Sequence, residues 1–327
     1  MTDSGAPFLK VENLSVRFPL RGARPFAARR FVQAVDDVSF AVSRGASFGI
    51  VGESGSGKST TAAAIMRLVD IASGSIELDG VALDALEGED LRLFRRRMQI
   101  VFQDPFSSLN PRARLGELVR EPLDIQKIGS GAERDARVSE LLALVGFPSE
   151  ARHAFPHQFS GGQRQRVGIA RALATSPELV VCDEPVSALD VAIQAQILNL
   201  LKRLQQERGL TYVFISHDLG VVKYMCDHVA VMYLGKIVET GPTASLFSRP
   251  AHPYTRALLA ARPSIHGRER AGVGPTRALG EPPSPIDLPS GCHFAGRCPL
   301  VDQRCHEEIP ELRSIGAEHM VACHLNA

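Results

Sequence analysis

The chain has 327 residues, which is enough for one large domain or two moderate domains with their own cores. Its net charge of +1 argues against a dedicated nucleic-acid binder, since such proteins usually carry a strong basic excess. No apolar run reaches the roughly 18 to 20 residues that cross a bilayer, so no transmembrane helix is expected.

The first residues, MTDSGAPFLKVENLSV, have no basic segment that leads into an apolar one. We therefore expect no secretory signal and a protein that stays in the cytoplasm. From residue 8 to about 85, short alternating or apolar runs predict strands. The pattern then favours helices at about 87–175, most clearly in LEGEDLRLFRRRM and ERDARVSELLALVG. This block is expected to be a helical subdomain inserted into the strands.

Strand-like runs return at residues 179–183 and 211–216. Between them a helix is predicted over 191–207, capped by Asp190 and ended by Gly209. Strands that alternate with helices predict βα units and a largely parallel sheet.

Beyond these units the pattern becomes less regular. Residues 229–241 predict a closing hairpin with its turn near Gly235. Residues 262–291 are rich in Pro, Gly and Arg and predict an irregular linker. A small tail that carries four cysteines follows.

The segment GESGSGKST contains the G-x-x-x-x-G-K-[ST] pattern of a phosphate-binding loop, between an apolar strand pattern and a helical one. Its glycines let backbone amides turn inward around the phosphates of a nucleotide. Lys58 supplies positive charge, and the Ser59 hydroxyl is placed for Mg²⁺. The alternative is a glycine-rich turn that merely precedes a lysine. The predicted nucleotide-binding residues here are Gly52, Glu53, Ser54, Gly55, Ser56, Gly57, Lys58, Ser59 and Thr60.

The run LVVCDEP carries Asp183 and Glu184 to the carboxyl end of a predicted strand, where open α/β sheets bind ligands. Asp183 is predicted to join the Mg²⁺ shell, and Glu184 to polarise a water for in-line attack on the γ-phosphate. Without the phosphate loop, the same residues would be read as a turn at the start of a helix.

The stretch FSGGQ is a second phosphate-binding pattern, although one nucleotide needs only one loop. Ser160, Gly161, Gly162 and Gln163 begin a helical pattern, and a hydroxyl with glycines at a helix N-terminus suits phosphate. A capped helix start without a ligand is the alternative. It explains Ser160 but not two consecutive glycines, which are costly in a helix.

Taken together, GESGSGKS, IVFQDP, FSGGQ, LVVCDEP, SALD and FISHD have the order and approximate spacing seen in ABC-transporter ATPase subunits. The chain resembles that family over about residues 8–245. The resemblance implies an α/β fold, a P-loop NTPase core of ABC type with an antiparallel β subdomain and an inserted α-helical subdomain. Residues 246–327 would form a small C-terminal cysteine-rich extension. It also implies a head-to-tail dimer, in which FSGGQ of one subunit contacts the ATP bound by its partner.

Further roles follow from the same resemblance, position by position. Phe18 stands where the family places an aromatic ring, usually Tyr, against adenine. Gln103 resembles the residue that contacts Mg²⁺ and the attacking water. His217 resembles the histidine that contacts the γ-phosphate and orients Glu184. Asp190 resembles a residue that crosses the dimer interface, and it is equally well read as the cap of its helix.

Two segments narrow the resemblance to importers of di- and oligopeptides: QDPFSSLNPR, and HPYTRALLAA at 252–261. The nickel importers share much of the core and usually lack the cysteine tail. The resemblance implies a second, often different ATPase subunit, two membrane-spanning permease subunits and an extracytoplasmic binding protein, with this chain peripheral at the cytoplasmic face. Pro105, Phe106 and Leu109 lie where the family receives a coupling helix of the membrane subunit.

The tail has the spacing C-x5-C-x6-C-x17-C. In a reducing compartment, clustered cysteines favour a metal over disulfides. The pairs C-x2-C or C-x4-C that zinc ribbons favour are missing, and the wider spacing suits a [4Fe-4S] cluster. Zinc and no metal remain alternatives, and His293, His306 or His324 could replace one thiolate. The predicted cluster ligands are Cys292, Cys298, Cys305 and Cys323.

Three other functions compete with peptide import. A soluble ABC ATPase of translation or DNA repair usually has two cassettes or a long coiled-coil insert, and neither is apparent in this sequence. A non-hydrolysing subunit is disfavoured by intact Lys58, Glu184 and His217. An exporter ATPase is disfavoured by the tail alone.

Overall fold

A computed structural model describes residues 6–20, 30–104, 108–261, 283–286 and 288–326. Pro105, Phe106 and most of the predicted linker lie outside these residues. Within the described ranges, no helix combines the length and the apolar character needed to cross a membrane.

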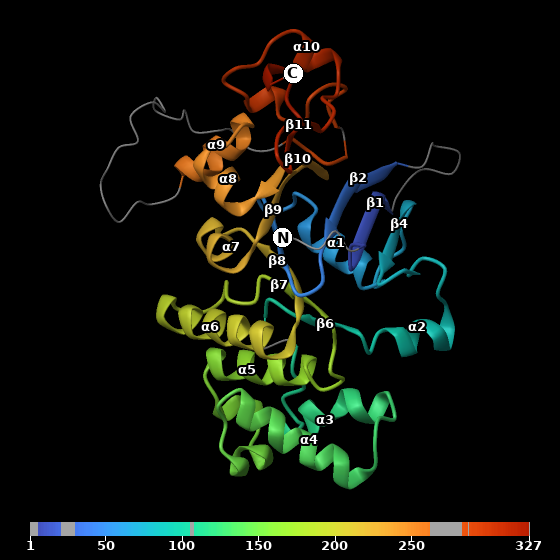
Figure 1. The fold of residues 1–327 in the computed structure, drawn as a ribbon, viewed down its shortest axis with the longest axis vertical. Helices are drawn as coiled ribbons and strands as arrows, with labels where there is room; N and C mark the ends of the chain where they lie inside the picture. Colours follow the sequence, from blue (N-terminus) through green and yellow to red (C-terminus); the bar gives the residue numbers. More distant parts are fainter. Residues whose placement is uncertain (1–5, 21–29, 105–107, 262–282, 287, 327) are drawn as a thin grey trace.

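The centre of the molecule is a sheet in the order β11-β12-β10-β9-β3-β8-β7-β6 (Figure 1). Strands β9, β3, β8, β7 and β6 run parallel to one another, as the alternation of strands and helices predicts. The strands of this sheet are β3 (Ser47–Val51), β6 (Met98–Val101), β7 (Leu179–Asp183), β8 (Thr211–Ser216), β9 (His228–Tyr233), β10 (Lys236–Pro242), β11 (Arg313–Gly316) and β12 (His319–Val321).

The central strands are apolar throughout because both faces of the sheet are covered. Successive side chains point to opposite faces, so neighbouring residues enter different cores. Val180 and Phe214 belong to one core, shared with the helices, whereas Val181 and Val213 belong to the other.

That second core lies under an antiparallel sheet in the order β2-β1-β4-β5, which confirms the predicted β subdomain. Helix α1 packs between the two sheets, since Ala62 and Ile65 join the same core. The elements are β1 (Leu9–Pro19), β2 (Phe31–Val42), α1 (Lys58–Ile65), β4 (Ser73–Leu78) and β5 (Val81–Ala82).

The predicted helical block is largely confirmed, and α3, α4 and α5 form one end of the molecule, with α2 to the side (Figure 1). Its elements are α2 (Gly88–Phe94), α3 (Leu115–Ile125), α4 (Gly131–Leu144), the 3-10 turns η1 (Ser149–His153) and η2 (Pro156–Gln158), and α5 (Gly161–Ala172). One part of the prediction was wrong, because the block contains strand β6 and α2 ends before it. A four-residue apolar run is too short for periodicity to distinguish it from a helix.

The remaining helices follow the sheet strands. Helix α6 (Val191–Arg208) is capped by Asp190 and followed by left-handed Gly209, as predicted. The others are α7 (Leu219–Met225), α8 (Thr243–Ser248), α9 (Pro253–Ala260), α10 (Arg304–Glu307), η3 (Ala295–Arg297) and η4 (His324–Asn326). The tail lies at the end of the molecule opposite α3 and α4 (Figure 1), and β12 extends the central sheet by pairing with β10.

Candidate active site

The phosphate loop follows β3 and leads into α1, the arrangement that the sequence pattern predicts. Two of its glycines have no room for a side chain. A Cβ on Gly52 would lie 2.2 Å from the Met232 carbonyl oxygen, and one on Gly57 would lie 2.3 Å from that of Ala34. Both also have positive φ angles, which disfavour other residues. The loop therefore wraps tightly against the two neighbouring strands.

The Lys58 side chain lies inside this loop. Its Nζ donates to the carbonyl oxygens of Gly52 and Glu53, each at 2.8 Å. Burial lowers the pKa of Lys58, and the nearby carboxylates of Glu184 and Asp183 oppose that shift. A buried ammonium among these groups is suited to an anionic ligand such as a nucleotide phosphate.

A pair of oxygen donors stands beside the loop, where β7 ends. Ser59 Oγ donates to Asp183 Oδ1 at 3.0 Å. Burial raises the pKa of the Asp183 carboxyl, and the hydrogen bond from Ser59 opposes this. A hydroxyl and a partly buried carboxylate are hard ligands, so this pair fits Mg²⁺ bound together with substrate phosphates.

Three residues far apart in the sequence meet at the Glu184 carboxylate. Its Oε2 accepts a hydrogen bond from Gln103 Nε2 at 3.1 Å and lies 3.0 Å from His217 Nδ1. Glu184 has a φ of 46°, an unusual conformation for a non-glycine residue, and its backbone N–H donates to the Ile215 carbonyl in β8. The backbone is thus held in a strained geometry where the carboxylate meets the other two side chains.

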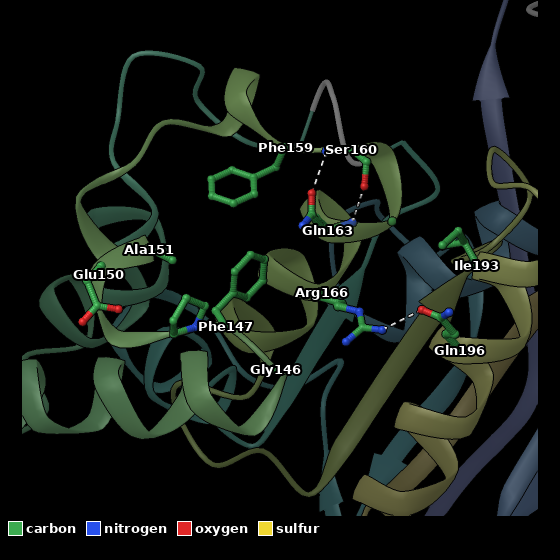
Figure 2. A pocket seen from close by; sticks show the side chains of 12 residues that line it. Gly146, Phe147, Glu150, Ala151, Phe159, Ser160, Gln163, Arg166, Ile193 and Gln196 are labelled. Atoms are coloured by element: carbon green, nitrogen blue, oxygen red, sulfur yellow. Dashed lines mark hydrogen bonds between the residues drawn. The ribbon is translucent and has the colours of Figure 1, made fainter.

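The FSGGQ residues form a capping box at the start of α5. Ser160 Oγ accepts from the Gln163 N–H at 3.4 Å, and the Gln163 side chain accepts from the Ser160 N–H at 3.0 Å. Figure 2 shows both side chains at the edge of a pocket of about 760 Å³, which Arg166 and Ile193 also line. Within the described part of the chain, the hydrogen bonds of Ser160 are made to Gln163 and none joins it to the phosphate loop.

The other predicted ATP contacts are placed as follows. Phe18 lies near the end of β1 with 40% of its surface exposed, so its ring is open to a ligand. Ser54 and Ser56 lie in the loop, Thr60 lies in α1, and Gly161 is the first residue of α5. Asp190 Oδ1 accepts from the Ile193 N–H at 3.0 Å, so its helix-cap role is present in the single chain.

Sequence reasoning missed a group of three residues, two of which hold the loop directly from outside. Tyr254, Tyr233 and Arg297 form a hydrogen-bonded group around Glu53. HPYTRALLAA pointed to Tyr254 only through resemblance to a family. Nothing in the local pattern around Arg297 distinguishes it from other tail arginines.

The four tail cysteines are all free thiols. The pKa of Cys292 is raised to about 11, mainly by burial, and the charges of Cys305, Cys298 and Cys323 contribute to this value. In the described parts of the chain, no set of three or more His, Cys, Asp and Glu side chains is placed to hold a metal ion. Neither the predicted [4Fe-4S] cluster nor the zinc alternative finds support in this geometry.

The fold and the site define a phosphate-loop ATPase. Comparisons with known proteins identify the family to which it belongs. Residues 35–187 match the ABC transporter family model, and residues 238–305 match that of the oligopeptide/dipeptide transporter C-terminal region. A protein named as a peptide import ATP-binding protein from Brucella ovis is 48% identical over 317 residues, 97% of either chain. One named as a peptide ABC transporter ATP-binding protein from Sinorhizobium fredii is 49% identical, covering 98% of this chain and 90% of its own.

Solved structures agree with this placement. An ATP-binding cassette solved as a dimer in a post-hydrolysis state, with ADP and phosphate, aligns with a TM-score of 0.63 and 31% identity, over 72% of this chain and 98% of its own. CbiO1 from Clostridium perfringens, part of an ABC transporter complex, aligns with a TM-score of 0.64 and 28% identity, over 74% of this chain and 91% of its own. The chain belongs to the family of ATP-binding proteins of peptide-type ABC transporters, and it is an ATPase.

Proposed function

We propose that this protein hydrolyses ATP to power the import of di- and oligopeptides through a membrane ABC transporter. The observation that carries the proposal is the meeting of Gln103, Glu184 and His217 beside the phosphate loop. The C-terminal match to oligopeptide/dipeptide transporters supports the choice of substrate.

Each group at the site has a defined task in this proposal. The loop amides and Lys58 neutralise the phosphates, and Phe18 stacks on the adenine. Ser59 and Asp183 would hold Mg²⁺, with a further contact from Gln103, and the ion would supply positive charge against the phosphates. Glu184 takes a proton from the attacking water. His217 and Gln103 hold the Glu184 carboxylate in position through the bonds described above.

Two such subunits act as a head-to-tail pair, in which Ser160, Gly161, Gly162 and Gln163 of one contact the γ-phosphate held by the other. Asp190 lies at the same interface. A helix N-terminus attracts anions, so the shared phosphate joins the subunits until hydrolysis separates them. The dimeric ATP-binding cassette with ADP and phosphate supports this assembly.

The remaining partners are two permease subunits, an extracytoplasmic peptide-binding protein and a second, paralogous ATPase subunit. The chain works at the cytoplasmic face of the membrane. A nickel or other small-solute importer with the same ATPase role is the second candidate, because the core motifs do not distinguish the transported solute.

The four tail cysteines are proposed to hold a [4Fe-4S] cluster. What supports this proposal is the sequence, which places Cys292, Cys298, Cys305 and Cys323 in one small segment with the spacing C-x5-C-x6-C-x17-C. Four thiolates are the ligand set of such a cluster, and these four cysteines would supply them. No step of ATP hydrolysis uses it. Iron and acid-labile sulfide should both be found in anaerobically purified protein, and the absence of both would remove the cluster.

Uptake of labelled di- and oligopeptides, with Ni²⁺ as a comparison, tests the function in cells that carry wild type, Glu184→Gln or Glu311→Gln. Glu311 is an exposed tail residue, so it controls for loss of a carboxylate alone. Peptide uptake should fall only for Glu184→Gln, with Ni²⁺ uptake unchanged. Unchanged peptide uptake would overturn the peptide assignment while leaving the ATPase assignment in place.

A further inference from the structure

The phosphate loop is held from outside by two residues of the C-terminal region. The Glu53 backbone N–H donates to Tyr254 Oη at 2.9 Å. The Glu53 carboxylate pairs with both terminal nitrogens of Arg297, with Nη1–Oε2 at 2.8 Å and Nη2–Oε1 at 3.0 Å. A bidentate pair of this kind fixes direction as well as charge.

Both residues are rigidly mounted. Tyr254 is fully buried and packs against Tyr233 and Phe294, with ring centroids 4.7 and 5.4 Å away. The Arg297 side chain is only 8% exposed, and its Nη1 also donates to Tyr233 Oη at 3.2 Å. These contacts restrict the conformations of the Arg297 side chain to ones that face Glu53 and Tyr233.

The segment that carries Tyr254 is itself anchored to the central sheet. Glu239, a buried residue of β10, accepts hydrogen bonds from the backbone N–H groups of Ala251 and His252 at 2.8 and 2.9 Å. His319 of β12 lies 2.8 Å from the same carboxylate. The sequence HPYT is thus connected through Glu239 to the strands, and through Tyr254 to the loop.

The Glu53 position matters because the same residue also holds Lys58, whose Nζ donates to the Glu53 carbonyl at 2.8 Å. Glu53 also places a carboxylate next to a loop that receives a polyanion. Paired with Arg297, that carboxylate is neutralised and directed at the tail. Unpaired, it would repel the phosphates of ATP, since like charges at short range are unfavourable.

We propose that Arg297 and Tyr254 are positioning residues for ATP, which hold Glu53 in the arrangement that leaves the phosphate loop and Lys58 ready for the nucleotide. The C-terminal region then controls ATP affinity directly. This inference rests on ATP binding at the loop, as in the proposed function, but not on the identity of the transported solute.

The test is the affinity of the purified full chain for a non-hydrolysable ATP analogue. Arg297→Gln should raise the dissociation constant about tenfold, since hydrogen bonds to charged groups are among the stronger ones. Arg297→Lys, which keeps the charge, should recover part of this loss. Arg304→Gln is the matched control, because Arg304 is an exposed tail arginine that pairs with nearby Glu308. It should leave the affinity unchanged.

A double-mutant cycle separates positioning from tail folding. In a Glu53→Gln background the carboxylate is gone, so Arg297→Gln should then change ATP affinity by less than about threefold. An equal loss in both backgrounds, or no loss in either, overturns the proposal.

Tyr254→Phe supplies a second route should Arg297→Gln fail to fold. It removes only the hydroxyl that accepts the Glu53 N–H, and ATP affinity should fall a few-fold. Tyr212→Phe is its control, because the buried Tyr212 hydroxyl donates to the Leu201 carbonyl away from the loop. Equal ATP affinities in these two variants overturn the proposal. Peptide uptake by wild type is measured in a separate experiment. A failure of the positioning hypothesis can therefore be distinguished from a failure of the peptide-import hypothesis.

Discussion

Gly162 lies in the first turn of α5, so close to α6 that a side chain has no room. An added Cβ would lie 2.2 Å from Ile193 Cγ2. That methyl belongs to a β-branched side chain, which has few alternative rotamers in a helix. In Gly162→Ala the clash with Ile193 can therefore be relieved only if the N-terminus of α5 or of α6 moves. Ser160 and Asp190 cap these two N-termini, and both are proposed to face the partner subunit.

The size of the effect can be isolated with a second glycine of the same helix. Gly168 has no atom within 4 Å of the position an added Cβ would occupy. Alanine is favoured over glycine by roughly 0.5–1 kcal/mol at Gly168, inside the helix, and by no more than that at Gly162, in its first turn. Overpacking costs about 1–3 kcal/mol, and only Gly162→Ala incurs it. The free energies of unfolding of the two variants should therefore differ by about 1–3 kcal/mol.

Denaturant unfolding of both purified variants measures this difference, and ATP turnover in the assembled transporter measures its consequence. Gly168→Ala should be at least as stable as wild type, with normal turnover. Gly162→Ala should be less stable than Gly168→Ala and should hydrolyse ATP more slowly. Equal stabilities would refute the steric argument, and normal turnover in a destabilised Gly162→Ala would refute the link to the ATP site.

Three further outcomes are expected. Glu184→Gln should slow phosphate release roughly 10²- to 10⁴-fold with ATP binding retained, and turnover within a few-fold of wild type would contradict the general-base role. Asp190→Ala should lower the free energy of unfolding by about 0.5–2 kcal/mol, because it removes the cap of α6. Asp190→Asn keeps the cap, so slower ATP turnover in that variant would reveal the proposed role of Asp190 at the dimer interface. Burial lowers the pKa of His252 to about 3, from an ordinary value of 6.5. As the pH falls, His252 therefore becomes protonated in the unfolded chain before it does in the folded chain. The free energy of unfolding decreases between pH 6.5 and about 3, by about 1.4 kcal/mol per pH unit. In His252→Asn, the asparagine side chain can still accept the hydrogen bond from the Tyr254 N–H, and it does not titrate. Urea unfolding of this variant should depend less on pH than that of wild type. An unchanged pH dependence would show that His252 is not its source.

The features that sequence analysis predicted well are those encoded by consecutive residues. The phosphate loop between β3 and α1 depends on a short pattern of glycines with no room for side chains. Helix α6 depends on its Asp190 cap and the left-handed Gly209 at its end. Strand β6 was missed because its four residues, Met98–Val101, follow directly on an amphipathic helix, and pairing with β7 decides their conformation.

The sequence by itself determined the chemistry of the protein, since the phosphate loop, the adjacent carboxylates of Asp183 and Glu184 and the FSGGQ stretch each consist of a few consecutive residues. Only the tertiary structure decided which groups meet. Gln103, Glu184 and His217 converge because three strand ends lie at one edge of the sheet. Arg297 reaches Glu53 across 244 positions of the chain. No local pattern encodes such a contact, because it is selected by the packing of the whole fold around it.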